Sequence, residues 1–211
     1  MIRLNTSLVM LSALCLCGFG YADDETIACQ DPVDNMQGVV NDIQLSLKDV
    51  CQKDNLTRAD VEAVIQKVFI PKVDIALITR QILGRQFWSK STDDEKKELE
   101  GLLSKLLSRQ YAEAFNCKYL NNDIEFYPLR GDIKKYTRVE ASLELDESTQ
   151  LLLRYALRCK DTDWRVYDVV IDGLSLSQTY RSQFNRVLQQ GGIKRLNAYL
   201  DQKLNKEDDD I

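Results

Sequence analysis

The chain of 211 residues contains no histidine. Histidine is the usual general base of serine and cysteine hydrolases and the commonest ligand of transition metals, so its absence excludes those mechanisms. The sequence also lacks a glycine-rich phosphate loop, a nucleophile elbow and a cluster of residues at metal-ligand spacing. We therefore expect a protein that is not an enzyme, with no catalytic residues, no metal and no cofactor.

Positive charge is also in short supply. The chain has 28 lysines and arginines against 33 aspartates and glutamates, a net charge of −5. Nucleic-acid-binding proteins need an excess of positive charge on one face, so we expect no nucleic-acid partner.

The first 22 residues have the pattern of a secretory signal peptide. Arg3 supplies the positive start, residues 8–19 form an apolar run too short to span a bilayer well, and Gly20-Tyr21-Ala22 is a cleavage site. A permanent anchor and a lipoprotein modified at Cys15 or Cys17 are less favoured. We expect residues 1–22 to be removed, residues 23–206 to form one exported domain, and residues 207–211 to be an acidic disordered tail.

Four cysteines remain after the signal peptide: Cys29, Cys51, Cys117 and Cys159. An even number in an oxidising compartment predicts two disulfides, with three possible pairings. If residues 33–50 form one helix, it is about 27 Å long, too long for Cys29 to reach back to Cys51. Cys117 and Cys159 would lie at opposite ends of a simple sheet. Two pairings stay open, and in both Cys29 and Cys51 each join the second half of the chain.

Hydrophobic periodicity divides the chain into helices, strands and helices. Apolar residues recur at helical spacing over residues 33–50, 57–69, 71–84, 92–115, 176–190 and 193–204. Residues 124–127, 138–145, 151–158 and 164–171 alternate as strands do, and their short connections predict antiparallel neighbours. The fold class is therefore α+β, with helices on one face of a four-stranded antiparallel sheet.

The stretch from Trp164 to Phe184 is predicted to be a last strand that runs directly into a helix. Strict alternation puts Trp164, Val166, Asp168 and Val170 on one face of the strand and Val169 and Ile171 on the other. Asp168 and Asp172 could form an acid–base couple on one face. We favour the structural interpretation, in which each carboxylate caps a helix or faces water.

Two segments carry a resemblance to a known family. YDVVIDGLSLSQTYRSQF, which ends at Phe184, and FIPKVDIALITRQILGRQFWSKSTDDEK, which begins at Phe69, resemble the MlaC (toluene-tolerance, Ttg2-type) family of periplasmic phospholipid-binding proteins. The resemblance extends from Asp31 to Leu204. It implies an NTF2-like or cystatin-like cradle, in which a helical N-terminal half packs on a four-stranded antiparallel curved sheet closed by C-terminal helices.

The resemblance also implies a function. The chain would be a soluble periplasmic monomer that carries phospholipid between the outer and inner membranes and so maintains outer-membrane lipid asymmetry. The partners implied are phospholipid, an inner-membrane ABC transporter complex with an MCE-domain subunit, and an outer-membrane lipoprotein–porin complex. The alternative is a periplasmic protein-interaction module with a filled core and no lipid ligand.

A carrier of this family needs an apolar pocket between helices and sheet. From periodicity we expect its lining to be Phe69, Val73, Ile78, Ile82, Leu83, Trp88, Leu103, Leu107 and Tyr111 from the helices and Leu153, Tyr155, Val169 and Ile171 from the sheet. Arg80 and Arg181 lie among apolar residues and could meet a lipid phosphate, but we favour surface arginines whose stems cover apolar side chains.

Overall fold

The computed structural model describes residues 29–114, 117, 124–146 and 149–209. The helical elements are α1 (Pro32–Cys51), α2 (Arg58–Val64), a π-helical turn η1 (Ile65–Phe69), a 3₁₀ turn η2 (Ile70–Lys72), α3 (Ile75–Trp88), α4 (Asp93–Ala114) and α5 (Leu176–Asp209). The predicted signal peptide lies outside the described residues. Helix α5 ends three residues into the segment predicted as an acidic tail.

The strands are β1 (Ile124–Phe126), β2 (Tyr136–Asp146), β3 (Thr149–Lys160), β4 (Asp163–Ile171) and β5 (Leu174–Ser175). They form one antiparallel sheet in the order β1-β2-β3-β4-β5. The α+β class is thus confirmed, but the prediction of four strands is wrong by one. The fifth arises because Asp172 and Gly173, with φ of 48° and 86°, form a tight turn that folds the chain back before the helix begins.

The faces of β4 differ from the strict alternation that the sequence predicts. Ala156 pairs with Asp168, and the next residue, Leu157, pairs with Val166. Tyr167 is therefore an extra residue, a β-bulge that moves the following side chains to the opposite face. As a result, Trp164 and Val166 share the apolar inner face of the sheet with Val169.

Helix α1 packs on this inner face. Its residue Met36 lies in one cluster with Val139, Leu157 and Trp164. The Trp164 indole Nε1 donates a hydrogen bond to the carbonyl oxygen of Gln30, 2.7 Å away, just before the helix. The start of α1 is therefore fixed to the sheet by both apolar and polar contacts.

The two disulfides are Cys29–Cys159 and Cys51–Cys117. The first joins the start of α1 to the end of β3, and the second joins the end of α1 to the segment after α4. The prediction that Cys29 and Cys51 each join the second half of the chain is confirmed, and one of the two open pairings is selected.

The start of α3 was predicted at Pro71, which is wrong. Pro71 lies in η2, and Asp74 caps α3 instead by accepting a hydrogen bond from the Leu77 amide at 3.1 Å. The helix also continues past Gly84, whose φ of 61° and ψ of 172° break the helical geometry. By contrast, the capping box of α4 is confirmed, since Thr92 and Glu95 exchange backbone–side-chain hydrogen bonds.

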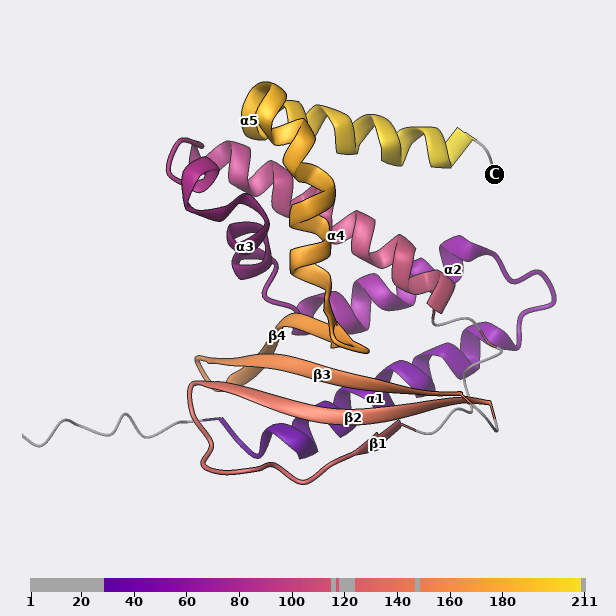
Figure 1. The fold of residues 1–211 in the computed structure, drawn as a ribbon. Helices are drawn as coiled ribbons and strands as arrows, with labels where there is room; N and C mark the ends of the chain where they lie inside the picture. Colours follow the sequence, from indigo (N-terminus) through magenta and orange to yellow (C-terminus); the bar gives the residue numbers. More distant parts are fainter. Residues whose placement is uncertain (1–28, 115–116, 118–123, 147–148, 210–211) are drawn as a thin grey trace, which may run out of the picture.

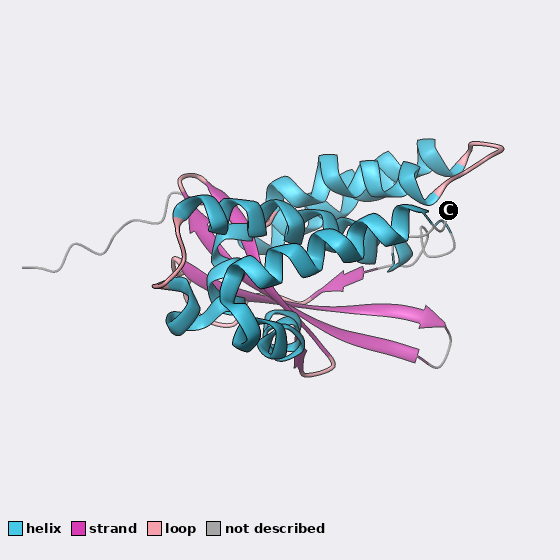
Figure 2. Cartoon of the chain, turned by 90° about the horizontal axis from the view of Figure 1, so that it is seen from above, coloured by secondary structure: helices cyan, strands magenta, loops and turns pink. Residues whose placement is uncertain are grey.

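Figure 1 shows α3, α4 and the first part of α5 above the β4 side of the sheet, while α1 runs along the strands. Seen from above, the helices cover that side and the long β2–β3 hairpin projects beside them (Figure 2). The upper helices share a leucine-rich core that includes Leu99, Leu103, Leu196 and Leu200. Helix α5 kinks at Gly191–Gly192, where two separate helices were predicted. Within the described ranges, no helix has the length and hydrophobicity required to cross a bilayer.

Candidate functional site

An apolar cavity lies where the upper helices meet strand β4. Its lining residues come from the end of η1, the residue after η2, and α3, α4, β4 and the start of α5: Phe69, Val73, Ile78, Leu107, Tyr111, Val166, Asp168, Val169, Leu176, Ser177 and Tyr180. The cavity is small, with a volume of about 30 Å³. The wall is hydrocarbon apart from one carboxylate and a few hydroxyl groups.

The helical side of the cavity depends on the π-helical turn η1. The turn ends at Phe69, which is buried and packs edge-on against Tyr111 of α4 with ring centroids 5.4 Å apart. A π-turn contains one more residue than an α-helical turn. The side chains after it are therefore rotated by about 100° around the helix axis relative to a continuous α-helix. Such turns occur frequently at functional sites. Here the turn brings two aromatic rings together on the cavity wall.

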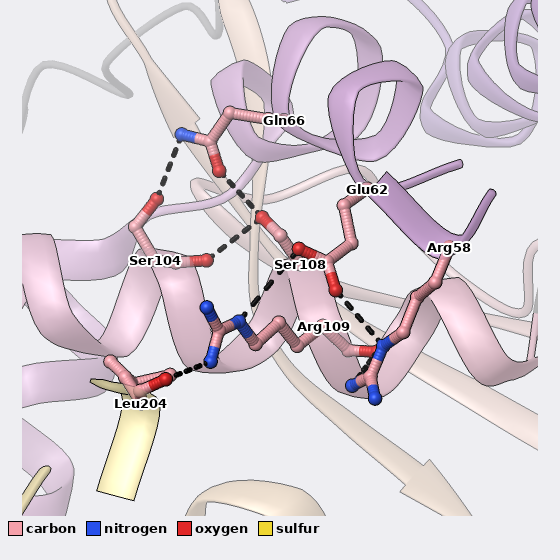
Figure 3. A network of polar contacts seen from close by, with 7 residues as sticks. All are labelled: Arg58, Glu62, Gln66, Ser104, Ser108, Arg109 and Leu204. Atoms are coloured by element: carbon pink, nitrogen blue, oxygen red, sulfur yellow. Dashed lines mark hydrogen bonds and ion pairs between the residues drawn. The ribbon is translucent and has the colours of Figure 1, made fainter. Parts of the chain in front are cut away.

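A polar network fixes this turn to α4 and α5 (Figure 3). The hydroxyl of Ser108 on α4 lies 2.5 Å from the Gln66 side-chain oxygen in η1, and the Gln66 amide donates to Ser104 at 3.3 Å. Arg109 donates to the carbonyl oxygen of Leu204 near the end of α5, and its Nε lies 3.8 Å from Glu62 of α2. These bonds fix the position of α4, whose residues Leu107 and Tyr111 line the cavity.

The carboxylate of Asp168 ties β4 to the beginning of α5. It accepts hydrogen bonds from the Ser175 hydroxyl at 2.6 Å and from the backbone amides of Ser177 and Val169 at 3.0 Å. Asp172 accepts a bond from the Leu152 amide at 3.1 Å. Both carboxylates therefore hold backbone in place, which agrees with the structural interpretation.

The tyrosines in and beside the cavity have strongly perturbed hydroxyl groups. Removal from water raises the pKa of Tyr155 and of Tyr180 to about 12, and it raises the pKa of Tyr111 as well. The Tyr180 hydroxyl donates to the side-chain oxygen of Gln110. At neutral pH these phenols stay uncharged, so they keep the wall free of negative charge apart from Asp168.

Polar contacts close the cavity at the β4 edge. Val73 forms a parallel bridge with Val166, and the next amide, that of Asp74, donates to the Val166 carbonyl at 2.8 Å. The Asp74 carboxylate is buried and forms an ion pair with Arg158 of β3. Asp74 thus connects the start of α3 to two strands of the sheet at once.

The structure brings six of the thirteen predicted lining residues to this cavity: Phe69, Val73, Ile78, Leu107, Tyr111 and Val169. Ile82, Leu83 and Leu103 lie instead in the core of the upper helices, where Trp88 packs at the margin. Tyr155 and Ile171 pack against the core on the inner face of the sheet, and Leu153 pairs with Ile171. Lipid contact by all thirteen remains a prediction.

Sequence reasoning missed Val166, Asp168, Leu176, Ser177 and Tyr180 as lining residues. The bulge at Tyr167 hid Val166, because strict alternation separates it from Val169. Leu176, Ser177 and Tyr180 come from the start of α5, which periodicity alone does not place against β4. The sequence did offer one signal. Ser175 and Ser177 are residues of a type that favours a helix start, and in the structure both bond to Asp168.

The two arginines considered for lipid phosphate do not line the cavity. Arg80 is exposed, and its guanidinium carbon lies 5.9 Å from the centre of the Trp88 ring. Arg181 is also exposed, and its guanidinium rests against the backbone of Gly84. Both positions agree with surface arginines that cover apolar residues.

Comparisons with known proteins agree with this geometry. The family model of the MlaC protein matches residues 37–202. The toluene tolerance protein Ttg2D of Pseudomonas putida is 22% identical over 167 residues, which span 79% of this chain and 77% of that protein. A phospholipid-binding protein from Ralstonia solanacearum, solved in complex with a phospholipid, superposes with a TM-score of 0.71 and 25% identity over 84% of this chain and 98% of that one. The family match covers most of the chain, and the whole sheet and the cavity lie within it, so this chain belongs to the MlaC family.

Proposed function

We propose that this protein is a soluble periplasmic phospholipid carrier, a monomer that moves lipid between the outer and inner membranes and so helps maintain outer-membrane asymmetry. The acyl chains of the bound phospholipid would lie in the apolar cavity between the upper helices and β4. Its partners would be an inner-membrane ABC transporter complex with an MCE-domain subunit and an outer-membrane lipoprotein–porin complex. No chemical step on the lipid is required.

The observation that carries the proposal is the hydrocarbon wall of the cavity, in a fold shared with a protein that holds phospholipid. Each methylene moved out of water is worth about 0.8 kcal/mol. Two acyl chains carry roughly thirty methylenes, so free lipid in water is disfavoured by on the order of 20 kcal/mol. A bilayer and an apolar cavity both remove this cost. Transfer between them is then close to neutral in free energy and can run without a catalytic group.

The cavity must widen to hold such a cargo. A cavity of about 30 Å³ has room for only a few water molecules. Widening requires the upper helices to move away from β4, which breaks the contacts of Asp74 with Val166 and Arg158. Neither disulfide joins the upper helices to β4 directly: Cys29–Cys159 links the segment before α1 to β3, and Cys51–Cys117 links the end of α1 to the segment after α4.

The first experiment is mass spectrometry of an organic-solvent extract of the protein, purified from periplasm without detergent. A carrier should release phospholipid in nearly equimolar amount. The filled-core interaction module should release none while keeping the same stable fold. If no lipid is released, this chain shares the fold of the family but does not carry phospholipid.

A pair of variants on one helix tests the cavity itself. Leu107 lines the cavity and is 6% exposed, whereas Leu102 is 8% exposed on the same helix and packs in the core of the upper helices. Leu107→Arg should abolish lipid retention because a charge in the wall opposes acyl chains. Leu102→Arg should damage stability by a similar amount but leave lipid in whatever fraction folds. Lipid retained by folded Leu107→Arg protein would refute this location of the site.

A further inference from the structure

A leucine stands almost fully exposed beside the cavity. Leu174 of β5 has 71% of its surface open to solvent, the largest value among the bulky apolar side chains of the described residues. A single exposed leucine is ordinary on a protein surface and needs no explanation by itself. The position of Leu174 is what sets it apart, because it continues a wall of the cavity.

The inner face of the sheet leads from the cavity to this residue. Val169 lines the cavity and is 8% exposed, Ile171 two residues on is half-buried, and Ile171 pairs directly with Leu174. Paired residues of neighbouring strands point to the same face, as do residues two apart in a strand. Two residues after Leu174, Leu176 again lines the cavity. Exposure therefore rises along one continuous apolar row from the inside to the surface.

The backbone around Leu174 is held firmly in this position. Asp172 and Gly173 have positive φ values of 48° and 86°, as the tight turn of a two-residue hairpin requires. The amide of Asp172 donates to the carbonyl of Leu152 at 3.0 Å, and the Asp172 carboxylate accepts from the Leu152 amide. Leu152 itself is 45% exposed. The turn thus holds Leu174 next to a second exposed leucine on β3.

We infer that the β4–β5 hairpin is the rim over which acyl chains enter and leave the cavity, with Leu174 as their first contact. This inference rests on the proposed function. The occupant is a hydrocarbon chain in transit, because the row ends inside a hydrocarbon-lined cavity. A protein partner would not need the row to continue inward. Leu174 contacts the acyl chain only while it enters or leaves the cavity and not once the lipid is bound. It therefore affects the rate of lipid transfer and not the affinity.

The test measures transfer of a pyrene-labelled phospholipid from vesicles of phosphatidylethanolamine and phosphatidylglycerol to the protein, and the reverse. Leu174→Asp should slow both directions by about tenfold, which is the factor expected when the contact of one leucine with a chain is lost. The amount of lipid bound at equilibrium should not change. Leu174→Met should restore the rate, because it returns an apolar side chain of similar size.

Leu45 on α1 provides the matched control. It is 61% exposed and does not line the cavity, so Leu45→Asp adds the same charge at a comparably exposed site. Its transfer rate should equal that of the unaltered protein. The inference is overturned if Leu174→Asp transfers lipid at the normal rate, or if both aspartate variants slow it equally through charge repulsion from the vesicles. Failure of the proposed function looks different: the unaltered protein would then take up no lipid at all.

Discussion

Replacing Cys29 and Cys159 together with serine should lower the free energy of unfolding by about 4 kcal/mol. The bridge joins residues 130 positions apart and links the start of α1 to the end of β3. Its removal leaves the folded contacts in place, since Trp164 and Met36 still pack in the same cluster. The effect arises mainly in the unfolded chain, which gains freedom when the link is cut.

The size of the effect follows from the nesting of the two loops. The inner bridge already closes a loop of 66 positions inside the outer one of 130. The outer bridge therefore constrains a further 130 − 66 = 64 positions. Loop-closure entropy for about 64 residues gives about 4 kcal/mol at 25 °C. For a chain of this length the melting temperature should fall by about 12 °C.

Urea denaturation followed by circular dichroism measures this change. The midpoint should fall and the slope of free energy against urea should rise, because the less constrained unfolded chain exposes more surface. The Cys51→Ser/Cys117→Ser variant is the control, and its loop of 66 positions predicts a loss of nearly the same size. A loss below about 1 kcal/mol with an unchanged slope would show that the outer bridge does not constrain the unfolded chain.

Three further predictions concern single positions. Asp74→Asn should cost about 2 kcal/mol and speed lipid exchange, because it breaks the ion pair with partly exposed Arg158 at the β4 edge; normal stability and exchange would contradict that role. Gly84→Ala should destabilise by about 1–3 kcal/mol because φ is 61°, whereas Gly38→Ala in open space on α1 should stabilise slightly; equal melting temperatures would refute the strain. The contribution of Tyr155 to the free energy of unfolding should be fully present below about pH 10 and should be lost as the pH rises toward 12, because the pKa of Tyr155 is about 12 in the folded protein and about 10 in the unfolded chain. Phenolate absorbance that shows no tyrosine ionising at a higher pH than the others would contradict this prediction.

The helices were predictable because their signals are local. The capping box of Thr92 and Glu95 and the leucine spacing of α4 are contained in one stretch of chain. The start of α3 shows the limit of such signals. Pro71 is compatible with a helix start, but the bond of the Asp74 amide to Val166 holds that segment against the sheet and delays the helix.

The site was predictable only in part because its walls come from distant segments. Phe69, Leu107 and Tyr111 were found since buried helical faces can be read from periodicity. Val166 was missed because one extra residue at Tyr167 exchanges the faces of a strand, and nothing in the alternation marks where that residue falls. Ile82 and Leu103 are equally apolar, yet they fill the core of the upper helices.

The sequence by itself determined the α+β class, the order of helices and strands, and the rule that Cys29 and Cys51 each bridge to the second half of the chain. These properties follow from local periodicity, capping and helix length. Tertiary structure alone decided which cysteine pairs with which, which face of β4 is apolar, and where a cavity opens between β4 and the helices. Each of these depends on contacts between residues far apart in the chain. A one-residue bulge or a small shift in packing changes them without changing the local pattern.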